Sequence, residues 1–180
     1  PMVIAYAIKH WNVKDPPTVQ DLWNRQEAIL SSFCHQVEEC TGASDIVEKF
    51  DSHGVPQAIA TSSRMEAVQK KRTRHERIFS YMKTVVTGDM MERPKPQPDI
   101  YLETAQRLQV DPSKCIVFED SIAGCQAGKA AGCTVIAVPD NRCDPAVFEG
   151  IADSVLPDLT CFYYEAWGLV GQPTSHDAKN

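Results

Sequence analysis

The segment CIVFEDS, from Cys115 to Ser121, joins a short apolar run to two adjacent carboxylates. A short continuous apolar run is typical of a strand that is covered on both faces, as in a parallel sheet. Residues 122–131 are mostly small and end at Gly132, which predicts a helix that packs closely on this strand. The segment therefore predicts one strand–helix unit, with Glu119 and Asp120 at the carboxyl end of its strand.

The same alternation occurs along most of the chain. Further strands are predicted at 55–60, 84–87, 134–138 and 153–156, and further helices at 43–51, 64–71, 99–108 and 145–149. Strands that alternate with helices imply parallel βαβ units. We therefore predict an α/β fold: a three-layer sandwich with a parallel, Rossmann-like sheet.

The beginning of the chain differs from this pattern. Residues 1–40 show the apolar spacing of helices, and Asp15-Pro16-Pro17 separates two of them because proline cannot continue a helix. Thr18 is placed to cap the second helix. We expect residues 1–40 to form a partial helical cap, residues 41–171 an α/β core, and residues 172–180 a polar tail.

The composition limits the classes of function. The 180 residues carry a net charge of −6 and show no basic stripe, so we expect no nucleic-acid partner. No apolar run reaches the length of a membrane span, and we expect no membrane partner. The seven cysteines form no CxxC pair, which favours a reducing, cytoplasmic location, with a zinc site as the alternative. The oligomeric state stays open.

Polar residues follow two of the predicted strands. In an open parallel sheet, ligands bind beyond the carboxyl ends of the strands. Thr61 and Ser62 follow the strand at 55–60, where a hydroxyl and backbone N–H groups can bind an anion. Lys95 lies between two prolines in the loop after the strand at 84–87, and its ammonium suits a phosphate oxygen. Each feature alone is more often a helix cap or a surface lysine.

Glu119 and Asp120 are a third polar feature at a strand end. Two neighbouring carboxylates repel each other unless a cation neutralises them, and hard oxygen ligands favour Mg²⁺. Alone, the pair could simply favour the positive end of the helix that follows. Together with the hydroxyl and the lysine, it indicates a site for phosphoryl chemistry with a divalent metal.

Three segments carry a resemblance to a known family. AIATSS (58–63), KPQPDIY (95–101) and VFEDS (117–121) resemble motifs II, III and IV of the haloacid dehalogenase superfamily, in its β-phosphoglucomutase-like branch. Within that branch, ATSSR (60–64) and KRTRHERIF (71–79) look most like pseudouridine-5′-phosphatases and glycerol-phosphate phosphatases. The resemblance extends from about residue 1 to residue 170.

The resemblance implies a role for each candidate residue. Thr61 would bind the transferring phosphoryl group with the N–H of Ser62, and Lys95 would bridge the phosphate and the nucleophile. Glu119 and Asp120 would hold Mg²⁺. The implied activity is that of a Mg²⁺-dependent phosphatase, which acts on a small phosphorylated sugar, polyol or nucleotide through an aspartyl-phosphate.

One motif of the family has no counterpart in this sequence. The family's motif I is an apolar strand followed by two aspartates, the first of which is the nucleophile, and nothing before Thr61 fits it. We therefore expect a truncated, inactive chain without the central strand. The strands that end at Ala60 and Phe118 would then lose a partner. A sugar-phosphate mutase and a non-catalytic phosphate-binding fragment are the alternatives.

Overall fold

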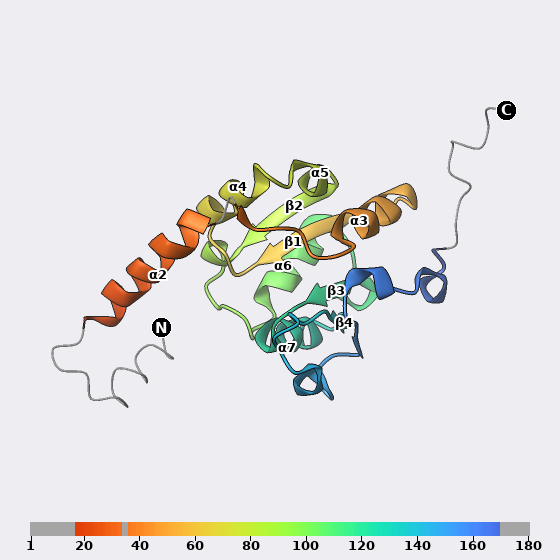
Figure 1. The fold of residues 1–180 in the computed structure, drawn as a ribbon. Helices are drawn as coiled ribbons and strands as arrows, with labels where there is room; N and C mark the ends of the chain where they lie inside the picture. The colour runs from red at the N-terminus through yellow and green to blue at the C-terminus, as the bar shows by residue number, and fades with distance from the viewer. Residues whose placement is uncertain (1–16, 34–35, 170–180) are drawn as a thin grey trace.

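The computed structural model describes residues 17–33 and 36–169 (Figure 1). Its helices are α2 (Val19–Phe33), α3 (Ala43–Ser52), α4 (Met65–Arg72), α5 (Glu76–Ser80), α6 (Asp99–Leu108) and α7 (Ile122–Ala130). Its strands are β1 (Gln57–Thr61), β2 (Met82–Thr87), β3 (Ile116–Glu119), β4 (Thr134–Ala137) and β5 (Ser154–Val155). No helix within the described ranges is long and apolar enough to cross a membrane.

All strand pairs in the described residues are parallel. β1 pairs with β2, and β3, β4 and β5 form a second group in that order. The predicted α/β class with parallel strands is therefore confirmed. Helix α5 was not predicted, and the short helix expected at 145–149 is present as a 3-10 helix, Pro145–Phe148.

The side chains of β3 pack into two apolar clusters, one on each face. In β3, Val117 packs in a cluster with Tyr101 of α6 and Cys125 of α7. The neighbouring Phe118 points to the opposite cluster, which contains Phe50 of α3. Because side chains alternate between the faces of a strand, this division places helices on both sides of the strands. The arrangement is the three-layer order that continuous apolar strands predict.

Helix α2 begins with the cap that the sequence predicts. The Oγ1 atom of Thr18 accepts a hydrogen bond from the N–H of Asp21 at 3.0 Å, and the carboxylate of Asp21 accepts one from the N–H of Thr18 at 3.1 Å. Such a reciprocal pair satisfies two N–H groups at the start of a helix. Figure 1 shows α2 to one side of the strands. The first predicted helix and the tail at 172–180 lie outside the described residues.

The linker between α2 and α3 is attached to the segment between α4 and α5. The ring nitrogen Nε2 of His75 lies 2.7 Å from the carbonyl oxygen of Val37. Arg74 forms an ion pair with Glu38. These contacts attach the chain that follows α2 to the α/β part. The domain division at residue 40 stays a prediction.

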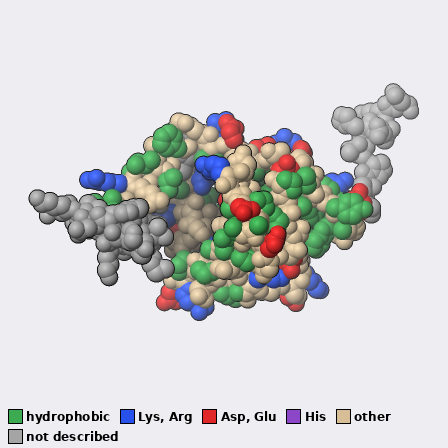
Figure 2. All heavy atoms as spheres, turned by 60° about the horizontal axis from the view of Figure 1, so that its bottom comes forward, with side chains coloured by type: hydrophobic (Ala, Val, Ile, Leu, Met, Phe, Trp, Pro, Cys, Tyr) green, Lys and Arg blue, Asp and Glu red, His purple; other side chains and the backbone are tan. Residues whose placement is uncertain are grey.

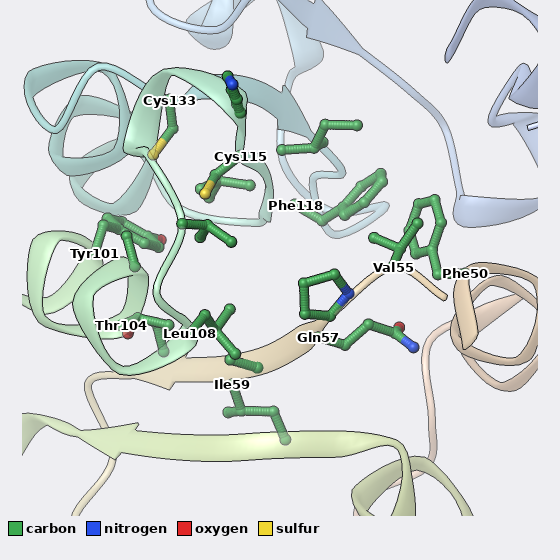
Figure 3. A pocket seen from close by; sticks show the side chains of 18 of the residues that line it. Phe50, Val55, Gln57, Ile59, Tyr101, Thr104, Leu108, Cys115, Phe118 and Cys133 are labelled. Atoms are coloured by element: carbon green, nitrogen blue, oxygen red, sulfur yellow. The ribbon is translucent and has the colours of Figure 1, made fainter. Parts of the chain in front are cut away.

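A cavity of about 820 Å³ lies between β1 and β3 (Figure 3). Ile59 of β1 and Phe118 of β3 contribute to its lining, as do Tyr101 and Leu108 of α6. In the part of the chain that the structure describes, β1 and β3 do not pair with each other. The strands therefore form two parallel groups that are joined across this space by helices and side chains.

Phe148 provides a test of the core. Its side chain is 1% exposed, whereas that of the neighbouring Val147 is 40% exposed. We expect Phe148→Ala to lower the free energy of unfolding by about 3 to 5 kcal/mol, because it leaves a large void. Val147→Ala should change it by less than about 0.5 kcal/mol. Urea unfolding followed by circular dichroism measures both, and equal effects would contradict the described packing.

Candidate functional site

Lys95 lies across the carboxyl ends of β1 and β3. Its Nζ atom donates a hydrogen bond to the carbonyl oxygen of Ala60, the residue before Thr61, at 3.2 Å. The same atom forms an ion pair with Glu119, the last residue of β3. Two of the strand ends that the sequence singles out therefore meet at one lysine.

Tyr101 is a third member of this centre. Its hydroxyl donates a hydrogen bond to Oε1 of Glu119 and accepts one from Nζ of Lys95 at 3.0 Å. The ammonium also lies 4.8 Å from the centre of the tyrosine ring, within the range of a cation–π contact. The side chains of Lys95 and Glu119 are only 8% and 7% exposed. The three groups therefore form a buried, charge-assisted network.

The second oxygen of Glu119 is bound by the turn that follows β3. Oε2 accepts hydrogen bonds from the backbone N–H of Ser121 at 3.3 Å and from its hydroxyl at 3.0 Å. Burial alone would raise the pKa of Glu119, but the charge of Lys95 and the hydrogen bonds from Lys95, Tyr101 and Ser121 outweigh it. The pKa therefore lies below its ordinary value, and the carboxylate stays ionised.

Asp120 stands in a different environment. Its side chain is exposed at the surface, yet the surrounding protein removes part of its hydration. This desolvation, followed by the negative charge of Glu119, raises the pKa of Asp120 above its ordinary value. A nearby cation would therefore stabilise the ionised form of Asp120. The pair thus combines one neutralised carboxylate and one that lacks full compensation.

The segment after β1 forms a compact turn. Oγ1 of Thr61 accepts a hydrogen bond from the N–H of Ser63 at 3.1 Å, and the carbonyl oxygen of Ser63 accepts one from the N–H of Gly88 at 3.0 Å. A Cβ atom on Gly88 would lie 2.4 Å from the carbonyl oxygen of Ser62, so only glycine permits this approach. The turn is thereby fixed against the end of β2. Ser62 is exposed beside it.

The structure brings some of the predicted residues into contact and leaves others adjacent. Lys95 and Glu119 touch, and Asp120 follows Glu119 directly. Among the described residues, no hydrogen bond joins Thr61 or Ser62 to these three, and the connection runs through the carbonyl group of Ala60. Residues 17–33 and 36–169 contain no cluster of three or more His, Cys, Asp or Glu side chains that could hold a metal.

Sequence reasoning missed two residues that shape the centre. Tyr101 stands in the quoted KPQPDIY segment, and the start of α6 at Asp99 places it in the first turn, from which a side chain can reach back toward Lys95. The position of Tyr101 in this first turn could have been used to predict its contact with Lys95. Gly124 approaches the carboxylate of Glu119 so closely that a Cβ atom would lie 2.0 Å from Cδ. No feature of the sequence distinguishes it from a glycine that serves only close helix packing.

Comparisons with known proteins identify the family of the chain. A family model described as haloacid dehalogenase-like hydrolase matches residues 2–138. The (DL)-glycerol-3-phosphatase 1, mitochondrial, of Arabidopsis thaliana is 36% identical over 170 residues, which cover 92% of this chain and 57% of that protein. A probable pseudouridine-5′-phosphatase of Drosophila melanogaster is 31% identical over 169 residues, which cover 91% of this chain and 72% of that protein. The chain thus spans little more than half the length of the first relative.

A solved structure gives the same assignment. A putative β-phosphoglucomutase from Thermotoga maritima matches with a TM-score of 0.66 and 28% sequence identity, and the match covers 85% of this chain and 71% of that one. The likeness agrees with the resemblance to the β-phosphoglucomutase-like branch that the motifs indicate.

The ion pair between Lys95 and Glu119 can be tested by stability. Lys95→Met leaves a buried carboxylate without its cation, and we expect it to lower the free energy of unfolding by about 3 to 5 kcal/mol. The control, Lys83→Met, changes an exposed lysine of β2 and should have little effect. Adding Glu119→Gln to Lys95→Met should restore part of the loss, because the uncompensated charge is gone. Equal effects of the two lysine substitutions in urea unfolding would refute the pairing.

Gly124→Ala tests the close approach to Glu119. Alanine normally stabilises a helix interior by about 1 kcal/mol relative to glycine. Here the added methyl group meets the carboxylate, and we expect a destabilisation of about 1 to 3 kcal/mol instead. Gln126→Ala, at an exposed position of the same helix, should be close to neutral. A stabilised Gly124→Ala variant in thermal unfolding would show that the approach is not tight.

Proposed function

Because the chain belongs to the haloacid dehalogenase-like hydrolase family, we propose that it supplies the phosphate-binding and metal-binding groups of a phosphatase for small phosphorylated metabolites. The contact of Lys95 with both Ala60 and Glu119 carries this proposal. It places a buried ammonium where two strand ends meet, which is the location at which open parallel sheets bind ligands. An ammonium there suits a phosphate oxygen.

Thr61, Ser62 and Lys95 bind the phosphoryl group in this proposal. The hydroxyl of Thr61 accepts a hydrogen bond from Ser63, which leaves its own hydrogen available for a phosphate oxygen. Ser62 contributes its backbone N–H. Lys95 supplies positive charge, and the network with Tyr101 and Glu119 fixes its position. Preorganised donors of this kind stabilise charge that develops during phosphoryl transfer.

Glu119 and Asp120 fit Mg²⁺ by their donor set. Both are hard oxygen donors at one strand end, and Mg²⁺ is commonly held by one or two carboxylates, several waters and a substrate phosphate. Burial and the charge of Glu119 raise the pKa of Asp120, and a bound cation would offset both effects. When bound, Mg²⁺ would neutralise negative charge on the phosphate. Lys95 and Ser121 keep Glu119 ionised and oriented for that role.

The relatives support the substrate class. Their names describe phosphatases of glycerol 3-phosphate and pseudouridine 5′-phosphate, and a further relative is a fructose-1-phosphate phosphatase of Escherichia coli, 35% identical over 136 residues. We propose a sugar, polyol or nucleoside phosphate as the substrate. Residues 1–40 would belong to the cap that selects it. A cytoplasmic location stays a prediction.

The proposed reaction requires a nucleophile besides these residues. By resemblance, an aspartate attacks phosphorus, the substrate oxygen leaves with a proton from a general acid, and water then hydrolyses the aspartyl-phosphate. No segment before Thr61 fits the motif that carries this aspartate, so we expect it to be missing from these 180 residues. Thr61, Lys95, Glu119 and Asp120 would then bind and orient phosphate and metal without completing the transfer.

Binding and turnover can be measured separately. We expect the 180-residue chain to bind inorganic phosphate in a titration followed by NMR, and Thr61→Val to weaken this binding by about tenfold, since a charge-assisted hydrogen bond contributes about 1.5 kcal/mol. Lys83→Met serves as the control on an exposed lysine. We expect no release of phosphate from an aryl phosphate above background, with or without Mg²⁺.

Two results would contradict these expectations. Absence of phosphate binding, or equal binding by wild type and Thr61→Val, would refute the proposed phosphate site. Mg²⁺-dependent turnover that is lost in Asp120→Asn would show that a nucleophile is present within the chain.

A further inference from the structure

Lys71 is a basic residue that the site described above does not include. It lies in the last turn of α4, in the run from Lys70 to Arg74. Side chains of a helix point toward its amino end, so a long side chain in the last turn can reach back along the helix. Nζ of Lys71 donates a hydrogen bond to Oγ of Ser63 at 3.2 Å. The ammonium therefore lies at the turn that follows β1.

The other basic residues of this run have different partners. Lys70 forms an ion pair with Glu66 at 2.8 Å. Arg72 lies over the ring of Phe79, and Arg74 pairs with Glu38. Within the described ranges, Lys71 forms no ion pair with a carboxylate. It is thus a partly buried cation whose contact is a neutral hydroxyl.

The local charge favours an anion near this hydroxyl. A partly buried ammonium loses hydration, and a neutral oxygen compensates it less than a carboxylate does. Figure 2 shows acidic and basic side chains in small separate groups on the face that it displays. The uncompensated charge points to a ligand that is negatively charged.

The positive charge of Lys71 can act on a ligand through the hydroxyl of Ser63, which it polarises. It accepts a hydrogen bond from Lys71, so its own hydrogen is available for donation. The backbone of Ser63 is fixed on both sides, because its N–H donates to Thr61 and its carbonyl oxygen accepts from Gly88. Ser63 therefore lies in the same turn as Thr61, two residues further along the chain. A donor polarised by a cation is a stronger donor to a phosphate oxygen.

We propose that Lys71 and Ser63 extend the phosphate site: Lys71 is a positioning residue that orients and polarises the Ser63 hydroxyl, and this hydroxyl donates to a phosphate oxygen of the substrate. The proposal rests on the proposed function of Thr61 and Lys95. It adds a second cation, which lies at the turn after β1, and it requires a ligand with at least two anionic oxygens. A phosphomonoester dianion meets this requirement.

Binding of inorganic phosphate to the 180-residue chain tests the proposal at constant ionic strength. We expect Lys71→Met to raise the Kd about fivefold, less than the loss of a whole hydrogen bond, because the Ser63 hydroxyl remains but is no longer oriented and polarised. Lys70→Met is the matched control, because it removes the same charge from the adjacent position, and it should leave the Kd unchanged. Lys71→Arg should recover most of the affinity.

A double-mutant cycle separates a positioning role from a general charge effect. If Lys71 acts through Ser63, Lys71→Met should add little to the loss already caused by Ser63→Ala. Additive losses, or equal effects of Lys70→Met and Lys71→Met, would overturn the proposal. Binding that depends on Thr61 but not on Lys71 refutes this inference alone. Failure of the wild-type chain to bind phosphate refutes the proposed function as well.

Discussion

The ammonium of Lys95 links the two strand groups at the point where chemistry is expected. It bonds to the backbone of β1 through Ala60 and to the side chain of β3 through Glu119. Neither partner would be stable there alone, since a buried carboxylate requires a cation and a buried lysine requires acceptors. Tyr101 and Ser121 complete the set of donors around Glu119. The geometry of the site and the contact between the strand groups therefore depend on the same few atoms.

Much of the fold follows from patterns that are local in the sequence. Continuous apolar runs such as 115–118 predict buried parallel strands, and the capping residue Thr18 marks the start of α2. The site was predictable to the extent that it lies at strand ends. The sequence does not show which residues that are far apart along the chain come into contact. The ion pair between Lys95 and Glu119 joins residues 24 positions apart, and only the folded chain brings them into contact.

The differences between the expected and the observed elements have physical reasons. The 3-10 turn at Pro145–Phe148 is too short for the helical spacing to distinguish it from an α-helix. Helix α5 has only five residues, so its amphipathic pattern is weak. Gly124 illustrates a further limit, because the same glycine would be expected for close packing on a strand. Its approach to Glu119 depends on a rotamer of the glutamate, which no sequence pattern specifies.

The cavity between β1 and β3 bears on how the two strand groups are connected. Strands within one sheet are fixed relative to each other by a ladder of hydrogen bonds, and β1 and β3 have no such ladder between them in the described residues. At the carboxyl ends of these strands, Lys95 supplies a polar connection instead, because its ammonium bonds to Ala60 and pairs with Glu119. The two strand groups therefore share a cation at this edge where neighbouring strands of one sheet would share backbone hydrogen bonds.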